Sequence, residues 1–232
     1  MTIESHPLEP FLPQDATILF LGSFPPPRAR WSMDFFYPNF NNDFWRVMGL
    51  VHFCDAQHFV APAGKKFNYE AVVDFCRAAG LAFFDTASQV RRLKDNASDA
   101  FLEVLQPTDV GALLARLPRC RTIVTTGGKA SEELAALLRN ASEELASVIP
   151  GLTGNLPDSP VIPDSPVIPG PSVIPGPTGN LPGAPVSIPA PGTSFDISAW
   201  GRTLRWWRMP STSRAYPLPL TAKASLYSLL WP

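Results

Sequence analysis

Short apolar runs alternate with helical patterns along most of this chain, and the alternation restricts the folds open to it. Three runs are rich in β-branched or aromatic side chains and stop at polar residues or glycine, as buried strands do: 16–23, 81–87 and 121–126. Apolar residues at helical spacing, beginning or ending near capping residues, lie between or after these runs at 42–53, 68–80, 107–118 and 129–145. A fourth strand, 202–210, and a closing helix, 219–231, are predicted near the C-terminus.

Strands that alternate with helices form βαβ units, and such units build a parallel sheet covered on both faces. We therefore predict a three-layer α/β/α fold with a central, mostly parallel four-stranded sheet. Ligands of such sheets bind outside the carboxyl ends of the strands. The segments that follow the predicted strand ends, and should share one rim, are 22–42, 85–92, 125–129 and 209–214.

Residues 148–192 differ in composition from the remainder of the chain. The segment repeats VIP four times and TGNLP twice, and it holds nearly half of the chain's 27 prolines. Proline lacks a backbone donor and has a fixed φ, so this segment is predicted to be a flexible, low-complexity insertion. The predicted organisation is one domain formed by 1–147 and 193–232, interrupted by the insertion. A tolerated repeat expansion and a docking segment for an unidentified protein partner are both open interpretations.

Charge and cysteine content exclude several classes of protein. The formal net charge is −1, which argues against a globally basic nucleic-acid binder but leaves room for a local basic patch. The three cysteines are far apart, so we expect no disulfide framework, structural metal or iron–sulfur cofactor. No apolar run reaches the ~18 residues of a membrane span. We expect a monomeric protein of the cytoplasm or nucleoid, neither secreted nor membrane-bound.

The loop after the first strand, GSFPPPRARWSMDFFYPNFNNDFW (22–45), combines prolines, aromatic rings and side-chain amides. Gly22 allows close approach of the backbone, Ser23 follows it, and the prolines limit the entropy lost on ordering. The loop contains neither G-x-x-x-x-G-K-[ST] nor G-x-G-x-x-G, so no nucleotide phosphate cradle is indicated. Its composition predicts a ligand loop at a strand end.

Two other turns contain residues suited to phosphate contact. Lys129 lies in TTGGKAS (125–131), a turn into a helix N-terminus that fits either a phosphate contact or a structural turn. In MPSTSR (209–214) the hydroxyl residues precede an arginine, a combination suited to phosphodiester oxygens as well as to an ordinary turn. The hydroxyl and cationic residues of this second turn are Ser211, Thr212, Ser213 and Arg214. No G-x-S-x-G or H-E-x-x-H motif supports another hydrolase class, and the three histidines receive no role.

Five ordered segments of the chain resemble the uracil-DNA glycosylase superfamily: LGSFP, FFYPNFNNDFW, GLAFFDTA, TIVTTGGKA and MPSTS. The chain is most similar to the branch that includes the hypoxanthine/uracil-DNA glycosylases. The resemblance extends over about 16–146 and 195–232, omitting only the insertion. It implies excision of a deaminated base, uracil and/or hypoxanthine, from damaged DNA after the base is flipped into a pocket.

The resemblance implies roles for individual residues. Asn42 matches the family's catalytic asparagine and would bond the base or position the water, while N-capping of the following helix is its alternative role. Asn39 is a second candidate amide for base binding. Phe36 or Tyr37 would stack on the base. Asp85 would assist the water or the sugar, or else would only cap a turn.

Departures from the family pattern leave the substrate open. Asn39 stands at the position of a family histidine, and Met209 stands where other branches have histidine. The first loop lacks the acidic residue of the uracil-specific branch, which predicts slow turnover or an unusual base preference. A catalytically weak or inactive nucleic-acid-binding member of this fold is the alternative function. A small-molecule hydrolase on the same scaffold is a third.

Overall fold

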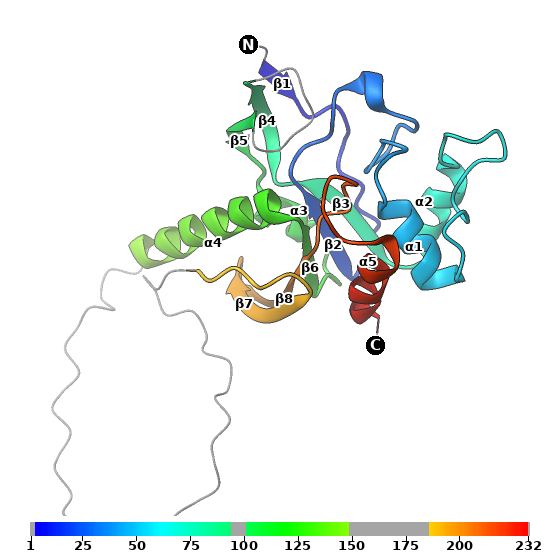
Figure 1. Ribbon diagram of the computed structural model, residues 1–232. Helices are drawn as coiled ribbons and strands as arrows, with labels where there is room; N and C mark the ends of the chain where they lie inside the picture. The colour runs from blue at the N-terminus through cyan, green and yellow to red at the C-terminus, as the bar shows by residue number, and fades with distance from the viewer. Residues whose placement is uncertain (1–2, 94–100, 149–185, 232) are drawn as a thin grey trace, which may run out of the picture.

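The computed structural model describes residues 3–93, 101–148 and 186–231, which form an α/β fold with two sheets (Figure 1). The larger sheet has five strands in the order β3-β2-β6-β8-β7. Its strands are β2 (Ile18–Gly22), β3 (Leu81–Asp85), β6 (Thr122–Thr126), β7 (Thr193–Ala199) and β8 (Arg202–Met209). The four predicted strands are parallel to one another, and β7 pairs with β8 in the antiparallel sense. The prediction of four strands is therefore wrong by one edge strand.

The turn between β7 and β8 has only two residues, and its sequence explains why β7 was not predicted. Ala199 pairs with Arg202, so Trp200 and Gly201 alone connect the strands, with φ of 50° and 72°. Two consecutive positive φ values are typical of the tight hairpin turn that usually carries Asn-Gly. Trp-Gly is an uncommon sequence for that turn, which is why composition did not indicate a hairpin here.

A second, three-stranded antiparallel sheet has the order β1-β4-β5. Its strands are β1 (Ile3–Ser5), β4 (Ala87–Arg92) and β5 (Leu102–Pro107). The segment 85–92, predicted as part of the rim loops, is therefore a strand from Ala87 onward, and only its first residues lie at the rim. The pairing of β1 with β4 brings the N-terminal segment close to the end of β3.

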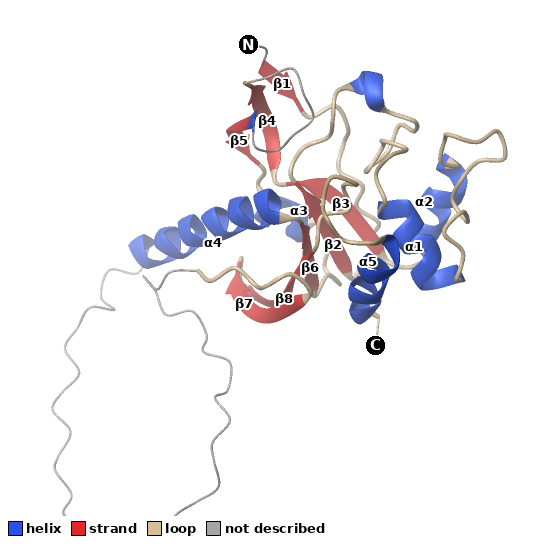
Figure 2. Cartoon of the chain, in the orientation of Figure 1, coloured by secondary structure: helices blue, strands red, loops and turns tan. Residues whose placement is uncertain are grey.

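Five helices flank the larger sheet (Figure 2): α1 (Phe44–Phe53), α2 (Tyr69–Ala78), α3 (Val110–Ala115), α4 (Gly128–Val148) and α5 (Leu220–Tyr227). The chain moves from β2 to β3 in one direction along the sheet and from β3 to β6 and β8 in the other. Right-handed crossovers then place α1 and α2 on one face, and α3 and α4 on the other. This is the predicted three-layer arrangement, with α5 packed against α1.

The helix termini follow local capping chemistry. The side chain of Asn68 accepts a hydrogen bond from the backbone of Ala71 at the start of α2, and Asp109 does the same for α3. Gly80, with φ of 65°, follows α2 as the predicted left-handed glycine. Asn42 is not the N-cap of α1: that position is occupied by Asp43.

The core is dominated by aromatic side chains between the sheet and α1. Phe20, Phe44, Trp45 and Phe83 are almost completely buried and meet edge-to-face or stacked. Such packing holds the first loop firmly against the sheet. Within the described ranges, no helix has both the length and the apolar character needed to cross a membrane.

The greater part of the predicted insertion, 149–185, lies outside the described residues. Its last residues, 186–192, lead into β7, and Val186 is buried against the core. The proposed division into domain and insertion therefore stays a prediction.

Candidate active site

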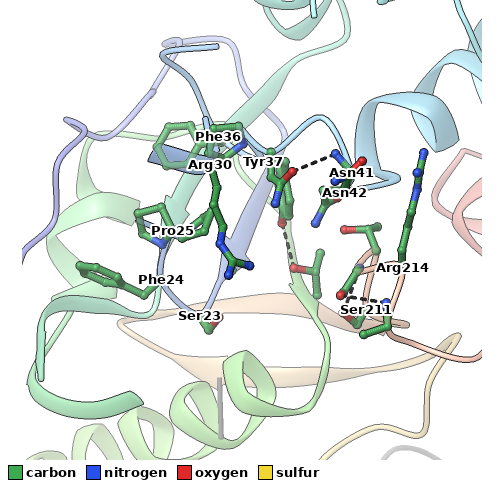
Figure 3. Close-up of a pocket in the computed structure, with 18 of the residues that line it drawn as sticks. Ser23, Phe24, Pro25, Arg30, Phe36, Tyr37, Asn41, Asn42, Ser211 and Arg214 are labelled. Atoms are coloured by element: carbon green, nitrogen blue, oxygen red, sulfur yellow. Dashed lines mark hydrogen bonds between the residues drawn. The ribbon is translucent and has the colours of Figure 1, made fainter. Parts of the chain in front are cut away.

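A cavity of about 730 Å³ opens at the carboxyl ends of β2, β3, β6 and β8 (Figure 3). The predicted rim segments do meet here, although they are far apart in sequence. The predicted site residues that line the cavity are Gly22, Ser23, Phe36, Tyr37, Asn39, Asn42, Asp85, Ser211, Thr212, Ser213 and Arg214. A volume of this order accommodates a nucleobase with its sugar.

Asp85 occupies the end of β3, directly opposite Gly22 on β2. A Cβ on Gly22 would clash with Oδ1 of Asp85, so glycine is required for the carboxylate to lie there. The other oxygen, Oδ2, is 3.0 Å from Nε2 of His6. Thr108 donates to the backbone oxygen of Asp85 and not to its side chain. The carboxylate therefore does not cap a turn, and it borders the cavity.

Tyr37 is the aromatic residue best placed to contact a ligand. Its hydroxyl lies 2.8 Å from Oγ1 of Thr126, and its ring stacks on Phe44 with centroids 3.8 Å apart. Its φ of 52° is uncommon for a bulky side chain and marks local backbone strain. Burial of the hydroxyl raises the pKa of Tyr37 far above its usual range, so the phenol stays neutral. Phe36, the other predicted stacking residue, is buried and packs on Phe83.

Asn39 and Asn42 both point their amide oxygens at the backbone. Oδ1 of Asn39 accepts from the N–H of Asn41 at 2.9 Å, and Oδ1 of Asn42 accepts from the N–H of Phe44 at 2.9 Å. A backbone N–H is only a donor, so these contacts fix which end of each amide is the oxygen. The NH₂ group of each amide makes no hydrogen bond within the described part of the chain. The cavity wall therefore presents two amide donors.

The 211–214 turn is held in place by a buried ion pair. Nζ of Lys223 is 2.9 Å from Oδ2 of Asp43 and donates to the backbone oxygen of Ser213 at the same distance. The backbone N–H of Asp43 donates to the oxygen of Thr212. Lys223 and Asp43 come from α5 and the start of α1, so two helices fix one turn. Sequence reasoning missed both residues.

Cationic side chains approach the cavity from two sides. Arg214 pairs with Asp43 at 3.3 Å and remains about half exposed. Arg30, which sequence reasoning did not single out, also lines the cavity. In Figure 3 its side chain extends into the cavity, while Arg214 lies beyond Asn42. Arg30 makes no ion pair with any residue that the structure describes.

Lys129 does not line the cavity. Its ammonium group pairs with Glu133 one turn further along α4, at 2.7 Å. The predicted phosphate contact of Lys129 therefore has no counterpart in the geometry of the site. Met209 is also fully buried and absent from the cavity wall. Among the described residues, no group of three or more His, Cys, Asp or Glu side chains is arranged to hold a metal ion.

Comparison with solved structures adds a distant likeness. No model of a protein family matches the chain, and a search of curated proteins finds no relative. A solved structure named "Solution NMR Structure of a putative Uracil DNA glycosylase from Methanosarcina acetivorans" is 24% identical. The match covers 60% of this chain and 78% of that one, with a TM-score of 0.44. At this level of similarity the comparison assigns neither a family nor an activity to the chain.

Proposed function

We propose that this protein is a monofunctional DNA glycosylase that hydrolyses the N-glycosidic bond of a deaminated base flipped out of DNA. The observation that carries the proposal is the meeting of three kinds of group in one cavity. Amide donors come from Asn39 and Asn42, a carboxylate comes from Asp85, and a hydroxyl-rich turn ends at Arg214.

The amide orientation supports recognition of a keto base. Because each amide oxygen already accepts a backbone N–H, the NH₂ groups are the ends of Asn39 and Asn42 that have no partner among the described residues. An NH₂ group pairs with a base carbonyl and is repelled by an exocyclic amino group. Deamination of cytosine or adenine replaces an amino group with a carbonyl. The donors therefore favour uracil over cytosine and hypoxanthine over adenine, the bases from which they arise.

The same donors suit the chemistry of bond cleavage. As the C1′–N bond breaks, its electron pair leaves with the base, whose carbonyl oxygens become more negative. Donors already aimed at those oxygens bind the transition state more strongly than the ground state. Water supplies the oxygen that bonds to C1′, one of its protons passes to Asp85, and the departing base gains a proton from solvent. The products are the free base and an abasic sugar.

The 211–214 turn and Arg30 support contact with the DNA backbone. Serine and threonine hydroxyls and backbone N–H groups bond phosphate oxygens, and arginine neutralises their charge. Arg214 and Arg30 approach the cavity from opposite walls, a spacing suited to a strand that enters the site on both sides of the flipped nucleotide. These contacts support DNA, rather than a free nucleoside or base, as the substrate.

The resemblance to the hypoxanthine/uracil-DNA glycosylase branch supports a choice of substrate between uracil and hypoxanthine. With Met209 buried, stabilisation of the leaving base falls to the asparagine amides of the first loop. The carboxylate absent from that loop has a counterpart in Asp85, which reaches the same cavity from β3.

The test is excision from oligonucleotides that carry uracil, hypoxanthine, xanthine or a T·G mismatch, in duplex and single-stranded form, followed by alkaline cleavage. We expect strand cleavage at uracil or hypoxanthine, and cleavage by the Asp85→Asn variant that is about 10²–10⁴-fold slower but still measurable in single turnover. If the wild-type protein in large excess cuts none of these lesions, the proposal is wrong. DNA binding without excision would identify a non-catalytic binding module, and the absence of both would favour a small-molecule hydrolase.

A further inference from the structure

His6 lies outside the motifs that suggested a function, yet its side chain reaches the end of β3. It follows β1, and its ring is enclosed by the rings of Phe24, Phe36 and Phe84, with centroid distances of 5.3, 6.2 and 4.5 Å. Its side chain is only 4% exposed. Burying a polar ring among aromatic ones is costly unless its nitrogens are hydrogen-bonded.

Both ring nitrogens of His6 have partners. Nε2 is 3.0 Å from Oδ2 of Asp85, and Nδ1 lies 2.8 Å from the backbone oxygen of Leu8 and 3.2 Å from its nitrogen. A carboxylate oxygen only accepts, so Nε2 carries the proton whether the imidazole is neutral or charged. His6 therefore donates to Asp85 in both states. The ring is held at one end by Leu8 and at the other by the carboxylate.

This bond decides which oxygen of Asp85 is available for chemistry. Oδ2 is occupied by His6, while Oδ1 lies over Gly22 and accepts no hydrogen bond from the described residues. Gly22 and Asp85 both line the cavity. The pairing thus orients the carboxylate with one bound oxygen and one open oxygen.

We propose that His6 is a positioning residue that holds Asp85 as the acceptor of a proton from the hydrolytic water. The inference rests on the proposed glycosylase function and adds to it a residue that does not itself touch the substrate. The imidazole of His6 donates from Nε2 to Oδ2 of Asp85 throughout the reaction. Oδ1 of Asp85 takes the proton of the water. The N-terminal segment thereby becomes part of the catalytic apparatus.

The other charged and titratable groups near Asp85 do not bond its carboxylate. The hydroxyl of Tyr37 lies next to Gly22 and bonds Thr126, and Arg30 lines the cavity across from the carboxylate. On the N-terminal side, Glu4 is paired with Arg92 at 2.8 Å. Of these groups, only His6 bonds the Asp85 side chain, so removing its donor should affect the orientation of that carboxylate alone.

The experiment compares single-turnover excision across a range of pH by wild type, His6→Phe, His6→Gln and the double variant His6→Phe/Asp85→Asn. Phenylalanine keeps an aromatic ring among the three neighbouring rings but removes the donor, and glutamine keeps a donor. His58→Phe is the matched control, since His58 is exposed, stacks on Phe53 and lies outside the cavity. Thermal unfolding and DNA affinity are measured for every variant.

We expect His6→Phe to slow excision about 10-fold or more, part of the 10²–10⁴ that a positioned acid or base contributes. DNA affinity should be unchanged, because His6 does not itself touch the substrate. His6→Gln should recover much of the rate. The double variant should be no slower than Asp85→Asn alone, because both substitutions disable one unit.

Three results would overturn the inference. They are a full rate for His6→Phe at every pH, a loss that multiplies with that of Asp85→Asn, or equal losses for His6→Phe and His6→Gln with lowered thermal stability. In each of these cases excision by wild type would still support the proposed function. An inactive wild-type protein would overturn both proposals together.

Discussion

At the scale of single residues, the two asparagines of the first loop show how a backbone contact can determine ligand preference. Oδ1 of Asn42 is committed to the N–H of Phe44, which leaves the NH₂ group for a ligand. The N-cap role considered for Asn42 and its functional role therefore use opposite ends of one amide. Asp43 is the N-cap residue, but Asn42 still satisfies a backbone donor in the first turn of α1.

Replacing Asn42 with aspartate separates these two ends. The variant keeps an oxygen for the Phe44 N–H but replaces the donor with a negative charge. We expect excision to fall about 10²–10³-fold, the usual cost of losing one transition-state donor, while thermal stability is kept. Single-turnover kinetics and thermal unfolding measure the two effects.

Asn68→Asp is the matched control, because Asn68 caps α2 away from the cavity and aspartate caps equally well. Equal losses of excision and DNA affinity in Asn42→Asp would instead assign Asn42 a role in binding alone.

Arg30 and Arg28 occupy the same short 3₁₀ helix, η1 (Arg28–Arg30), but only Arg30 lines the cavity. Arg28 pairs with Asp34 at 2.7 Å. If Arg30 neutralises one phosphate, Arg30→Ala should reduce the slope of log K against log salt by about 0.9 for duplex DNA. Arg214→Ala should do the same.

Fluorescence anisotropy titrations at several salt concentrations measure the slope, with Arg28→Ala as control. An unchanged slope in Arg30→Ala would contradict the phosphate contact and leave the guanidinium as a ligand of the base.

At the scale of elements, the 211–214 turn depends on α1 and α5. Inside the turn, the N–H of Ser213 donates to Oγ of Ser211 at 3.2 Å, and the Asp43–Lys223 pair connects the turn to both helices. Lys223 is 1% exposed, so its charge is stable there only because the carboxylate and the Ser213 carbonyl surround it.

Lys223→Met should therefore lower the free energy of unfolding by up to about 3–5 kcal/mol, the typical cost of removing one partner of a buried ion pair, because Asp43 keeps only the half-exposed Arg214 as a partner. Urea denaturation followed by circular dichroism measures the change. The double variant Lys223→Met/Asp43→Asn removes both charges and should be more stable than Lys223→Met. If the single and double variants were equally stable, the ion pair would not be what holds the turn.

At the scale of the whole molecule, His52 couples stability to pH. It lies on α1 against Phe75 and the C-terminal Trp231, with ring centroids 4.8 and 4.4 Å away, and its Nε2 is buried without a partner among the described residues. Burial lowers the pKa of His52 below its ordinary value. Below about pH 6.5 the unfolded chain binds a proton at this position that the folded protein does not.

The free energy of unfolding should therefore decrease as the pH falls from about 7 toward the lowered pKa of folded His52. His52→Phe should remove this decrease while keeping the packing against Trp231. Urea denaturation between pH 5 and 7.5 provides the measurement, and an identical pH dependence in the variant would refute the assignment.

The order and type of the main elements were predictable from the sequence. The four parallel strands, the helices between them and the convergence of their ends follow from periodicity and short-range signals such as Asn68, Asp109 and Gly80. These are local properties, since hydrophobic spacing and capping act over a few residues. The small sheet and β7 were missed because their strands are only partly buried and contain no continuous apolar run, and because Trp-Gly is an unusual hairpin turn.

The residues of the candidate site also fall into two groups, those that the sequence indicated and those that it did not. The loop amides, Asp85 and the 211–214 turn could be recognised as sequence segments, because each carries a distinctive composition. The partners that hold them could not: His6 meets Asp85 across 79 positions, and Lys223 meets Asp43 across 180. A lone histidine or lysine has no local signal of burial. Its role depends on which distant group satisfies its charge or hydrogen bonds, and only the packed tertiary structure determines that pairing.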